Sequence, residues 1–256
     1  KGADTLARTG GVQIKSAVNY RTSLVEDIAA TEAVAAQAGG VVVWDLSHAT
    51  GVLNLQLNAH NAKLATGCTY KFVNGGPGAP SFIYARGDFA SRMQSPISGW
   101  FGHATPFAFD AGYRQLEGVG RFAAGTPGVL SLSALDAALS AFDGVAMSDV
   151  AAKARALGDL VVARTAALGL ESISPADSRK RGGHVSVRHA DGYAVTQALI
   201  ARGIIPDFRA PDAIRFGVAP LYMRFVDVWD GMDQLADILA TRAWDRSEFM
   251  RRSAVT

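Results

Sequence analysis

The chain has 256 residues, 49% apolar and 19% charged, with a formal net charge of +2; this composition excludes a disordered protein and indicates a sizeable core. It has no long basic run typical of nucleic-acid binding, no apolar stretch as long as a membrane span, and five histidines without zinc-like spacing. We therefore expect no metal, nucleic-acid or membrane partner. The single cysteine, Cys68, excludes an internal disulfide, so we expect a reducing, cytoplasmic compartment.

The first elements in chain order are a short strand and a helix. Residues 12–15 alternate between apolar and polar side chains, which predicts a strand that ends near Ser16. Ser23 and Glu26 have the spacing of a capping box, in which two side chains bond the free amides at a helix start. We therefore expect a helix from Ser23 to Ala38, ended by the two glycines that follow.

Two apolar runs then predict neighbouring buried strands. Residues 41–46 form a short, β-branched run with Asp45 near its end, and residues 64–70 form a second run that ends before Lys71. The strand–helix–strand order indicates a parallel sheet, and such sheets bind ligands beyond the carboxyl ends of their strands. We therefore expect Asp45, His48 and Lys71 to lie at one edge of the sheet.

The pattern changes in the second half of the chain. The Gly- and Pro-rich residues 75–127 predict loops with short strands, over a length that is unusual for a plain connector. A boundary near Ala141 predicts two domains, 1–140 and 141–256. The further elements expected are helices from Ser133 to about Phe142 and over 149–169, 191–203 and 226–244, strands around 185–187 and 214–218, and core positions at Trp229, Met232, Leu235, Ala236 and Leu239.

Lys71 and Asp45 suggest a specific chemistry beside the ordinary one. A lysine at the edge of a core, next to the glycine-rich loop of residues 75–78, has the setting of a Schiff-base lysine. An acid on a neighbouring strand suits a pyridinium nitrogen. From these residues alone the ordinary alternatives stay open: a solvated lysine, a turn-forming Asp45, a packed His48 and Arg215 in a surface ion pair.

Several separated motifs together resemble one enzyme family. The strings at residues 41–48 and 67–78 are similar to those of kynureninases, which are pyridoxal-phosphate (PLP) enzymes of the aspartate-aminotransferase-like superfamily. The resemblance covers essentially the whole chain in order, and it continues through Ser98–His103, Gly125–Pro127, Lys180–Ser186 and Arg215–Tyr222.

The resemblance implies an α/β protein of PLP fold type I. Such a protein has a parallel-rich central sheet in its large domain and a small α/β C-terminal domain. The front part of the family's length would be absent, since the chain opens at Lys1 inside what looks like an existing domain. We therefore expect the chain to hold the lysine half of the site, without the aromatic residue that stacks on the PLP ring.

Five residues near the expected sheet edge receive roles from the resemblance. Lys71 would hold PLP as a Schiff base and move protons between substrate and cofactor, and Asp45 would keep the pyridinium nitrogen protonated. Tyr70 would bind the phosphate and take a second role in proton transfer. His48 would lie beside the cofactor, and the hydroxyl of Ser16 would contact it.

Further residues receive roles on the same basis. Trp100 and Thr126 would reach the cofactor phosphate from a partner subunit, which implies a homodimer with a shared active site. Arg215 would bind the substrate α-carboxylate through its planar fork of N–H groups. His103 would line the pocket for the aryl group.

The implied activity is hydrolysis of L-kynurenine, or of 3-hydroxykynurenine, to L-alanine and anthranilate or 3-hydroxyanthranilate. This reaction belongs to tryptophan catabolism by the kynurenine pathway and to NAD biosynthesis. Two alternatives stay open: another fold type I lyase or transaminase with a different amino acid substrate, and an inactive, truncated remnant. The sequence does not decide which kynurenine is preferred, because the shape of the pocket decides it.

Overall fold

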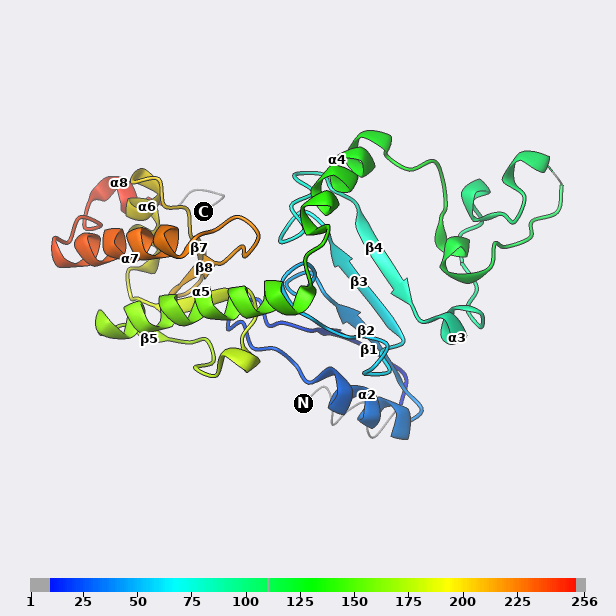
Figure 1. Cartoon of the computed structure of the whole chain (residues 1–256), viewed down its shortest axis with the longest axis horizontal. Coiled ribbons are helices and arrows are strands. Elements are labelled where there is room, and N and C mark those ends of the chain that lie inside the picture. Colours follow the sequence, from blue (N-terminus) through cyan, green and yellow to red (C-terminus); the bar gives the residue numbers. More distant parts are fainter. Residues whose placement is uncertain (1–9, 110, 252–256) are drawn as a thin grey trace. The chain divides into compact units, whose positions relative to one another are not determined.

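The computed structural model describes residues 10–109 and 111–251, which form two compact units (Figure 1). Of the described residues, the first unit holds 10–17, 27–50, 55–109 and 111–143. The second unit holds 18–26, 51–54 and 144–251. Chain order alone does not indicate that the two short segments belong with the C-terminal part, and the domain division after residue 140 stays a prediction.

The first unit is built on a mixed sheet in which parallel pairing predominates. In the described residues the strands lie in the order β1 (Val12–Ser16), β2 (Val41–Asp45), β3 (Leu64–Cys68) and β4 (Ser81–Ala85). Strands β1 and β3 pair parallel to β2, whereas β4 pairs antiparallel to β3. The expected α/β fold with a parallel-rich sheet is confirmed.

The parallel register brings the carboxyl ends of β1, β2 and β3 to one edge of the sheet. Ser16 pairs with Asp45, and Asp45 pairs with Thr66. Two further backbone bonds follow directly, from Ala17 N to Asp45 O at 2.9 Å and from Leu46 N to Thr66 O at 2.8 Å. Open α/β sheets bind their ligands at this kind of edge.

Helix α2 (Ile28–Gln37) is joined to β2 by a buried polar pair. The indole N–H of the fully buried Trp44 donates to Glu32 Oε1 at 2.8 Å. Glu32 is only 3% exposed, so the bond satisfies two groups that have both lost their contact with water. The helix begins after Asp27, whose carboxylate accepts from the N–H of Ala30 at 2.9 Å.

The prediction of a capping box at Ser23 and Glu26 is wrong. Ser23 is fully buried in a tight loop with a left-handed backbone (φ 64°), and its N–H donates to Asn19 O at 2.8 Å. Its carbonyl accepts from the N–H of Gly182 at 2.8 Å. The backbone of Ser23 therefore belongs to a loop of the second unit, and the helix starts only after Asp27.

The second unit packs helices against an antiparallel sheet. In the described residues the strands lie in the order β5 (Glu171–Ser172), β6 (His184–Arg188), β8 (Ala213–Gly217) and β7 (Asp207–Arg209). Helices α5 and α6 contact the sheet, and α7 packs on both of them. Their bounds, with those of two short elements, are α5 (Met147–Ala167), η5 (Ser178–Lys180), α6 (Gly192–Ala201), α7 (Phe225–Ala240) and α8 (Ser247–Met250).

Helix α7 departs from expectation at Trp229. We expected this residue in the core, but its side chain is 46% exposed. The guanidinium of Arg164 lies 4.3 Å from the ring centre, so a cation–π contact accommodates the ring at the surface. Met232 and Leu235 are buried as expected, whereas Ala236 and Leu239 are half-buried.

Helix α4 (Val129–Leu139) begins earlier than expected. Ser133 does not cap it: the helix starts after Gly128, and the Ser131 hydroxyl donates to Gly128 O at 2.9 Å. The short turn η4 (Ser140–Phe142) extends it to the expected end.

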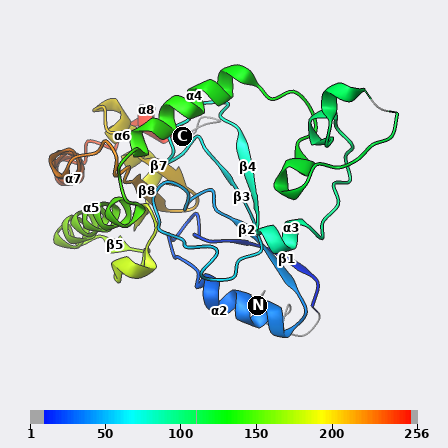
Figure 2. The same cartoon turned by 45° about the vertical axis from the view of Figure 1, so that its right-hand side comes forward.

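Residues 87–124 form an arm of short helical turns beyond β4. It contains α3 (Gly87–Ala90), η1 (Trp100–Gly102), η2 (Pro106–Ala108) and η3 (Gly118–Phe122). Because β4 runs antiparallel to β3, the arm starts at the edge opposite to the carboxyl ends of β1, β2 and β3. The turn η1 contacts η3, and η3 contacts α3 and β4. Figures 1 and 2 show that the arm starts at α3 and extends outward from the sheet on the side of β4.

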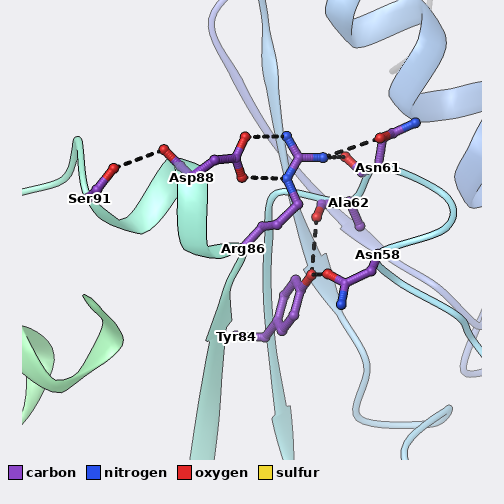
Figure 3. A network of polar contacts seen from close by, with 7 residues as sticks. All are labelled: Asn58, Asn61, Ala62, Tyr84, Arg86, Asp88 and Ser91. Atoms are coloured by element: carbon purple, nitrogen blue, oxygen red, sulfur yellow. Dashed lines mark hydrogen bonds and ion pairs between the residues drawn. The ribbon is translucent and has the colours of Figure 1, made fainter. Parts of the chain in front are cut away.

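A polar network fixes the point where the arm leaves β4 (Figure 3). Tyr84 donates to Asn58 Oδ1 at 2.5 Å, and Arg86 donates to both carboxylate oxygens of Asp88 at 2.6 and 2.8 Å. Another N–H of Arg86 donates to Asn61 O at 3.2 Å. The side-chain hydrogen bonds from Arg86 lower the pKa of Asp88. Because Asp88 is exposed, the ion pair adds little stability and serves mainly to set the direction of the chain.

No single helix in the described residues is long and apolar enough to cross a membrane. Residues 129–142 and 147–167 meet the length and composition requirement only as a bent pair. Such a pair is weak evidence for a membrane span, because the core helices of soluble proteins pass the same test. Helix α5 is itself a helix with a buried face, which includes Val150, Ala154, Leu157 and Val161.

The core of the second unit can be tested at Ile214. Ile214→Ala should lower the free energy of unfolding by about 2–5 kcal/mol, because the deleted atoms leave a cavity among fully buried neighbours. Urea unfolding followed by circular dichroism measures the loss. The matched control Ile205→Ala shortens a side chain that is 82% exposed and should cost less than about 0.5 kcal/mol. Equal losses would contradict the position of Ile214 in the core.

Candidate active site

The candidate site begins with a carboxylate that is held from two sides. Asp45 is the last residue of β2, and it is half-buried. The hydroxyl of Ser16, its partner on β1, donates to Asp45 Oδ2 at 2.9 Å. The backbone N–H of Ser47 donates to Asp45 Oδ1 at 2.9 Å. One oxygen is therefore oriented by a residue that the strand pairing places, and the other by the turn that follows β2.

These neighbours decide the ionisation of Asp45. Burial acts first, to raise the pKa of its carboxyl, but hydrogen bonds from the hydroxyl and N–H of Ser47 and from Ser16 oppose it, as does the charge of His48. Together they outweigh burial, and the pKa lies below its ordinary value of 3.8. Asp45 is thus an anion at neutral pH, as the partner of a protonated ring nitrogen must be.

Lys71 lies in a turn just after β3, because the strand ends at Cys68 and not at residue 70. The turn is closed by Gly75 N donating to Thr69 O at 2.9 Å and by Asn74 N donating to Lys71 O at 3.0 Å. This geometry keeps Lys71 half-buried at the carboxyl edge of the sheet.

The Lys71 amine is connected to the Asp45 turn through Cys68. Lys71 Nζ lies 3.5 Å from Cys68 Sγ, and this buried thiol donates to Ser47 O at 3.6 Å. Neither Ser47 nor Cys68 was expected in the site from the sequence pattern. Two local patterns could have identified them. Ser47 follows Asp45 by two residues, which is the spacing of a turn closed by an Asp side chain, and Cys68 precedes Lys71 by three residues.

Tyr70 and His48 complete the group at this edge. The Tyr70 ring lies under Lys71 Nζ, with 4.9 Å to its centroid, and is 51% exposed. His48 is half-buried, and its charge acts on Asp45. The structure therefore brings together five of the residues selected from the sequence, Ser16, Asp45, His48, Tyr70 and Lys71, while their chemical roles stay predictions.

Trp100 and Thr126 lie elsewhere in the first unit. Trp100 is 43% exposed in the arm, and its ring contacts Phe101 and Phe107 at centroid distances of 4.6 and 5.4 Å. The arm's two sides are pressed together beside it, since a Cβ at Gly99 would lie 1.7 Å from Ala124 O. Exposed Thr126 follows shortly after Ala124. In the described residues, neither residue bonds to the Asp45 and Lys71 group.

A cavity of about 560 Å³ opens in the arm beside Trp100. Its wall includes His103, which is 8% exposed and accepts from Thr105 N through Nδ1 at 3.0 Å. Because Nδ1 accepts, Nε2 carries the proton and donates to Gly112 O at 3.1 Å. His103 is therefore held through both ring nitrogens in a wall that also includes Tyr113.

Arg215 belongs to the second unit, on β8. Its side chain is 12% exposed, pairs with Asp207 and donates to the backbone carbonyl of Tyr20 at 2.6 Å. The ordinary alternative, a surface ion pair, is thus replaced by a largely buried one. Its role toward a substrate stays a prediction.

Comparison with known proteins places this geometry in a family. Residues 150–235 match a family model described as the kynureninase C-terminal domain. Over 257 aligned residues the chain is 41% identical to the kynureninase of Burkholderia mallei (strain SAVP1), across 99% of this chain and 62% of that protein. The chain belongs to the kynureninase family. It spans less than two thirds of the length of this curated relative.

Solved structures show the same fold as this member of the kynureninase family. The apo cysteine desulfurase of Thermococcus onnurineus NA1 matches with a TM-score of 0.77 and 16% identity, over 93% of this chain and 62% of that chain. C-DES, solved with glycine covalently linked to its PLP cofactor, matches with a TM-score of 0.77 and 19% identity, over 93% of this chain and 64% of that chain. At these identities the likeness concerns the fold alone, and it confirms PLP fold type I.

The arrangement around Asp45 predicts a pH effect that is specific to Ser16. Ser16→Ala removes one bond to the carboxylate, so the pKa of Asp45 should rise toward its ordinary value of 3.8. A carboxyl with a lowered pKa stabilises the fold fully above its unfolded pKa, and this contribution is lost as the pH falls through the folded pKa. As the pH falls, the Ser16→Ala variant should therefore lose this stabilising contribution at a higher pH than the wild type does. Carbon-13 NMR titration of labelled aspartate measures the change.

The control for this titration is Ser131→Ala, which removes a hydroxyl that donates to Gly128 O at the start of α4. The pKa of Asp45 should not change in this variant. A Ser16→Ala variant with an unshifted Asp45 would show that the hydroxyl is not one of the groups that keep the carboxyl ionised.

Proposed function

We propose that this chain carries the lysine-bearing part of a PLP-dependent kynureninase. The reaction is hydrolysis of the Cβ–Cγ bond of L-kynurenine, or of 3-hydroxykynurenine, to L-alanine and anthranilate or 3-hydroxyanthranilate. The observation that carries the proposal is the connection of Lys71, through Cys68 and Ser47, to the ionised Asp45 at one sheet edge. Family membership selects this reaction from those that the fold supports.

The residues at this edge fit PLP by their chemistry. A Schiff base needs a primary amine, which Lys71 offers, and a pyridinium nitrogen needs an anion, which Asp45 offers. Hydroxyls of Ser16 and Tyr70 and the imidazole of His48 add polar contacts for the same ligand. Bound PLP supplies an electron sink that stabilises negative charge developing on the substrate.

The chain's own residues then have separate tasks. Asp45 fixes the ring nitrogen in its protonated form, and Ser16 and Ser47 keep that carboxylate oriented. Lys71 holds the cofactor and, once free, moves the proton at the substrate α-carbon. The ring of Tyr70 lies beside Lys71, and its hydroxyl binds the cofactor phosphate and assists this proton transfer.

The position of the arm supports a homodimer with a shared site. The ring of Trp100 contacts Phe101 and Phe107 in the arm. The arm starts at the sheet edge opposite to the carboxyl ends of β1, β2 and β3, where Asp45 and Lys71 lie. A second copy can offer its Trp100 and Thr126 to the cofactor phosphate in a site that a single copy leaves incomplete. We infer the cytoplasm, within tryptophan catabolism, as the setting for this dimer.

Replacing Lys71 tests the proposed reaction. Lys71→Arg keeps the positive charge but cannot form a Schiff base, so anthranilate release should fall by about 10²–10⁴-fold or more. The assay follows anthranilate fluorescence after PLP and L-kynurenine are added. Lys63→Arg, at a half-buried lysine of the same unit, should keep nearly full activity. Retained activity in Lys71→Arg would remove Lys71 from the mechanism.

Mixing two inactive variants tests the shared site. Lys71→Arg and Trp100→Ala should each be inactive alone. After subunit exchange, half of the dimers are mixed and each has one intact site, so about one quarter of wild-type activity should return. Complementation is measured by anthranilate release after the two proteins are unfolded and refolded together. No recovery, with mixed dimers present by native mass spectrometry, would contradict a site built from two copies.

A further inference from the structure

The strand that carries Arg215 has an apolar face and a polar face. Ile214 lies in the core, so the side chain of its neighbour Arg215 points to the opposite face of the sheet. Ser186 on β6 and Asp207 on β7 pair directly with Arg215. Directly paired residues share a face, and the three strands therefore place Ser186, Arg215 and Asp207 in one polar row.

Two acceptors hold the guanidinium of Arg215. Nη2 forms an ion pair with Asp207 Oδ2, and Nη1 donates to the backbone carbonyl of Tyr20 at 2.6 Å. The limited exposure of the side chain restricts its movement further. The other N–H groups of this guanidinium have no hydrogen-bond partner within the described parts of the chain, so they can meet a ligand.

Asp207 is shared with a second arginine. Arg209 Nη2 reaches the same oxygen, Asp207 Oδ2, at 2.8 Å. Two guanidinium charges against one carboxylate leave a net charge of +1 (2 − 1) for the three groups. Arg215 is therefore oriented by a carboxylate that does not neutralise the cluster, which suits the binding of an anionic group.

We propose that Asp207 is the positioning residue through which Arg215 binds the substrate α-carboxylate, with Arg209 as the compensating charge. The inference rests on the proposed function, which gives Arg215 that ligand. Without the Asp207 carboxylate, Arg209 and Arg215 repel each other and the guanidinium of Arg215 keeps only one anchor. The loss should affect the binding of carboxylated ligands and not the breaking of the carbon–carbon bond.

The first experiment compares Asp207→Asn with Asp212→Asn in PLP-loaded protein. Asp212 is the matched control, because it pairs with Arg21 at 2.5 Å and with Arg188 at 3.0 Å. Asp207→Asn should raise KM for L-kynurenine by ~10-fold or more with kcat within ~3-fold, and Asp207→Glu should recover part of the loss. Asp212→Asn should keep both constants near the wild-type values. An unchanged KM, or a fall in kcat alone, would overturn the positioning role.

Calorimetric titration separates this inference from the proposed reaction. L-Kynurenine and its decarboxylated amine are titrated into the wild type, Asp207→Asn, Arg215→Lys and the double variant. The wild type should bind L-kynurenine more tightly than the decarboxylated amine, and Asp207→Asn should reduce this difference in affinity. In protein that already carries Arg215→Lys, adding Asp207→Asn should reduce the difference no further.

The titration remains decisive if catalysis fails. A wild type that shows this preference but releases no anthranilate would sink the proposed reaction and support the positioning role. A wild type without the preference, or an equal loss for both ligands in Asp207→Asn, would overturn the positioning role.

Discussion

The parallel pairing of β1, β2 and β3 is the constraint on which the candidate site depends. Because the three strands run in one direction, Ser16 and Asp45 stand side by side at the ends of β1 and β2, with Thr66 of β3 next to them, two residues before β3 ends. The chain leaves the sheet there in turns, and these turns carry the remaining polar groups, including Lys71. A shift of one residue in the β1–β2 register would turn Ser16 away from Asp45 and remove a bond that keeps the carboxyl ionised.

Charge is arranged differently in the two units. In the first unit an anion, Asp45, is surrounded by hydrogen-bond donors and lies near an amine. In the second unit a carboxylate, Asp207, is shared by two arginines, and the excess is positive. The carboxylate of Asp45 and the positive cluster around Arg215 match the two requirements of the proposed chemistry, since a cofactor ring nitrogen needs an anion and a substrate carboxylate needs a cation. Each unit thus offers one of the charges that a PLP enzyme acting on an amino acid requires.

The sequence predicted the sheet edge because its signals there are local. The apolar run that ends near Asp45 and the motif around Lys71 are contiguous, so pattern and resemblance identified both residues. The errors lie where a long-range contact decides. Ser23 has capping-box spacing, but a bond from Gly182 holds it in a loop, and Trp229 has core spacing, but Arg164 accommodates it at the surface. The pairing of Asp207 with Arg215 is different: it spans only eight residues, across β7 and β8, but the sequence pattern predicted no strand at residues 207–209.

Trapping the cofactor with borohydride tests the central claim most directly. Protein incubated with PLP is reduced with sodium borohydride, digested and mapped by mass spectrometry, so that any lysine joined to PLP keeps a stable pyridoxyl group. We expect the label on Lys71, and less of it when Asp45→Ala removes the partner of the ring nitrogen. A label spread over other lysines, or one on Lys71 that does not depend on Asp45, would contradict a cofactor site at the carboxyl edge of β1, β2 and β3.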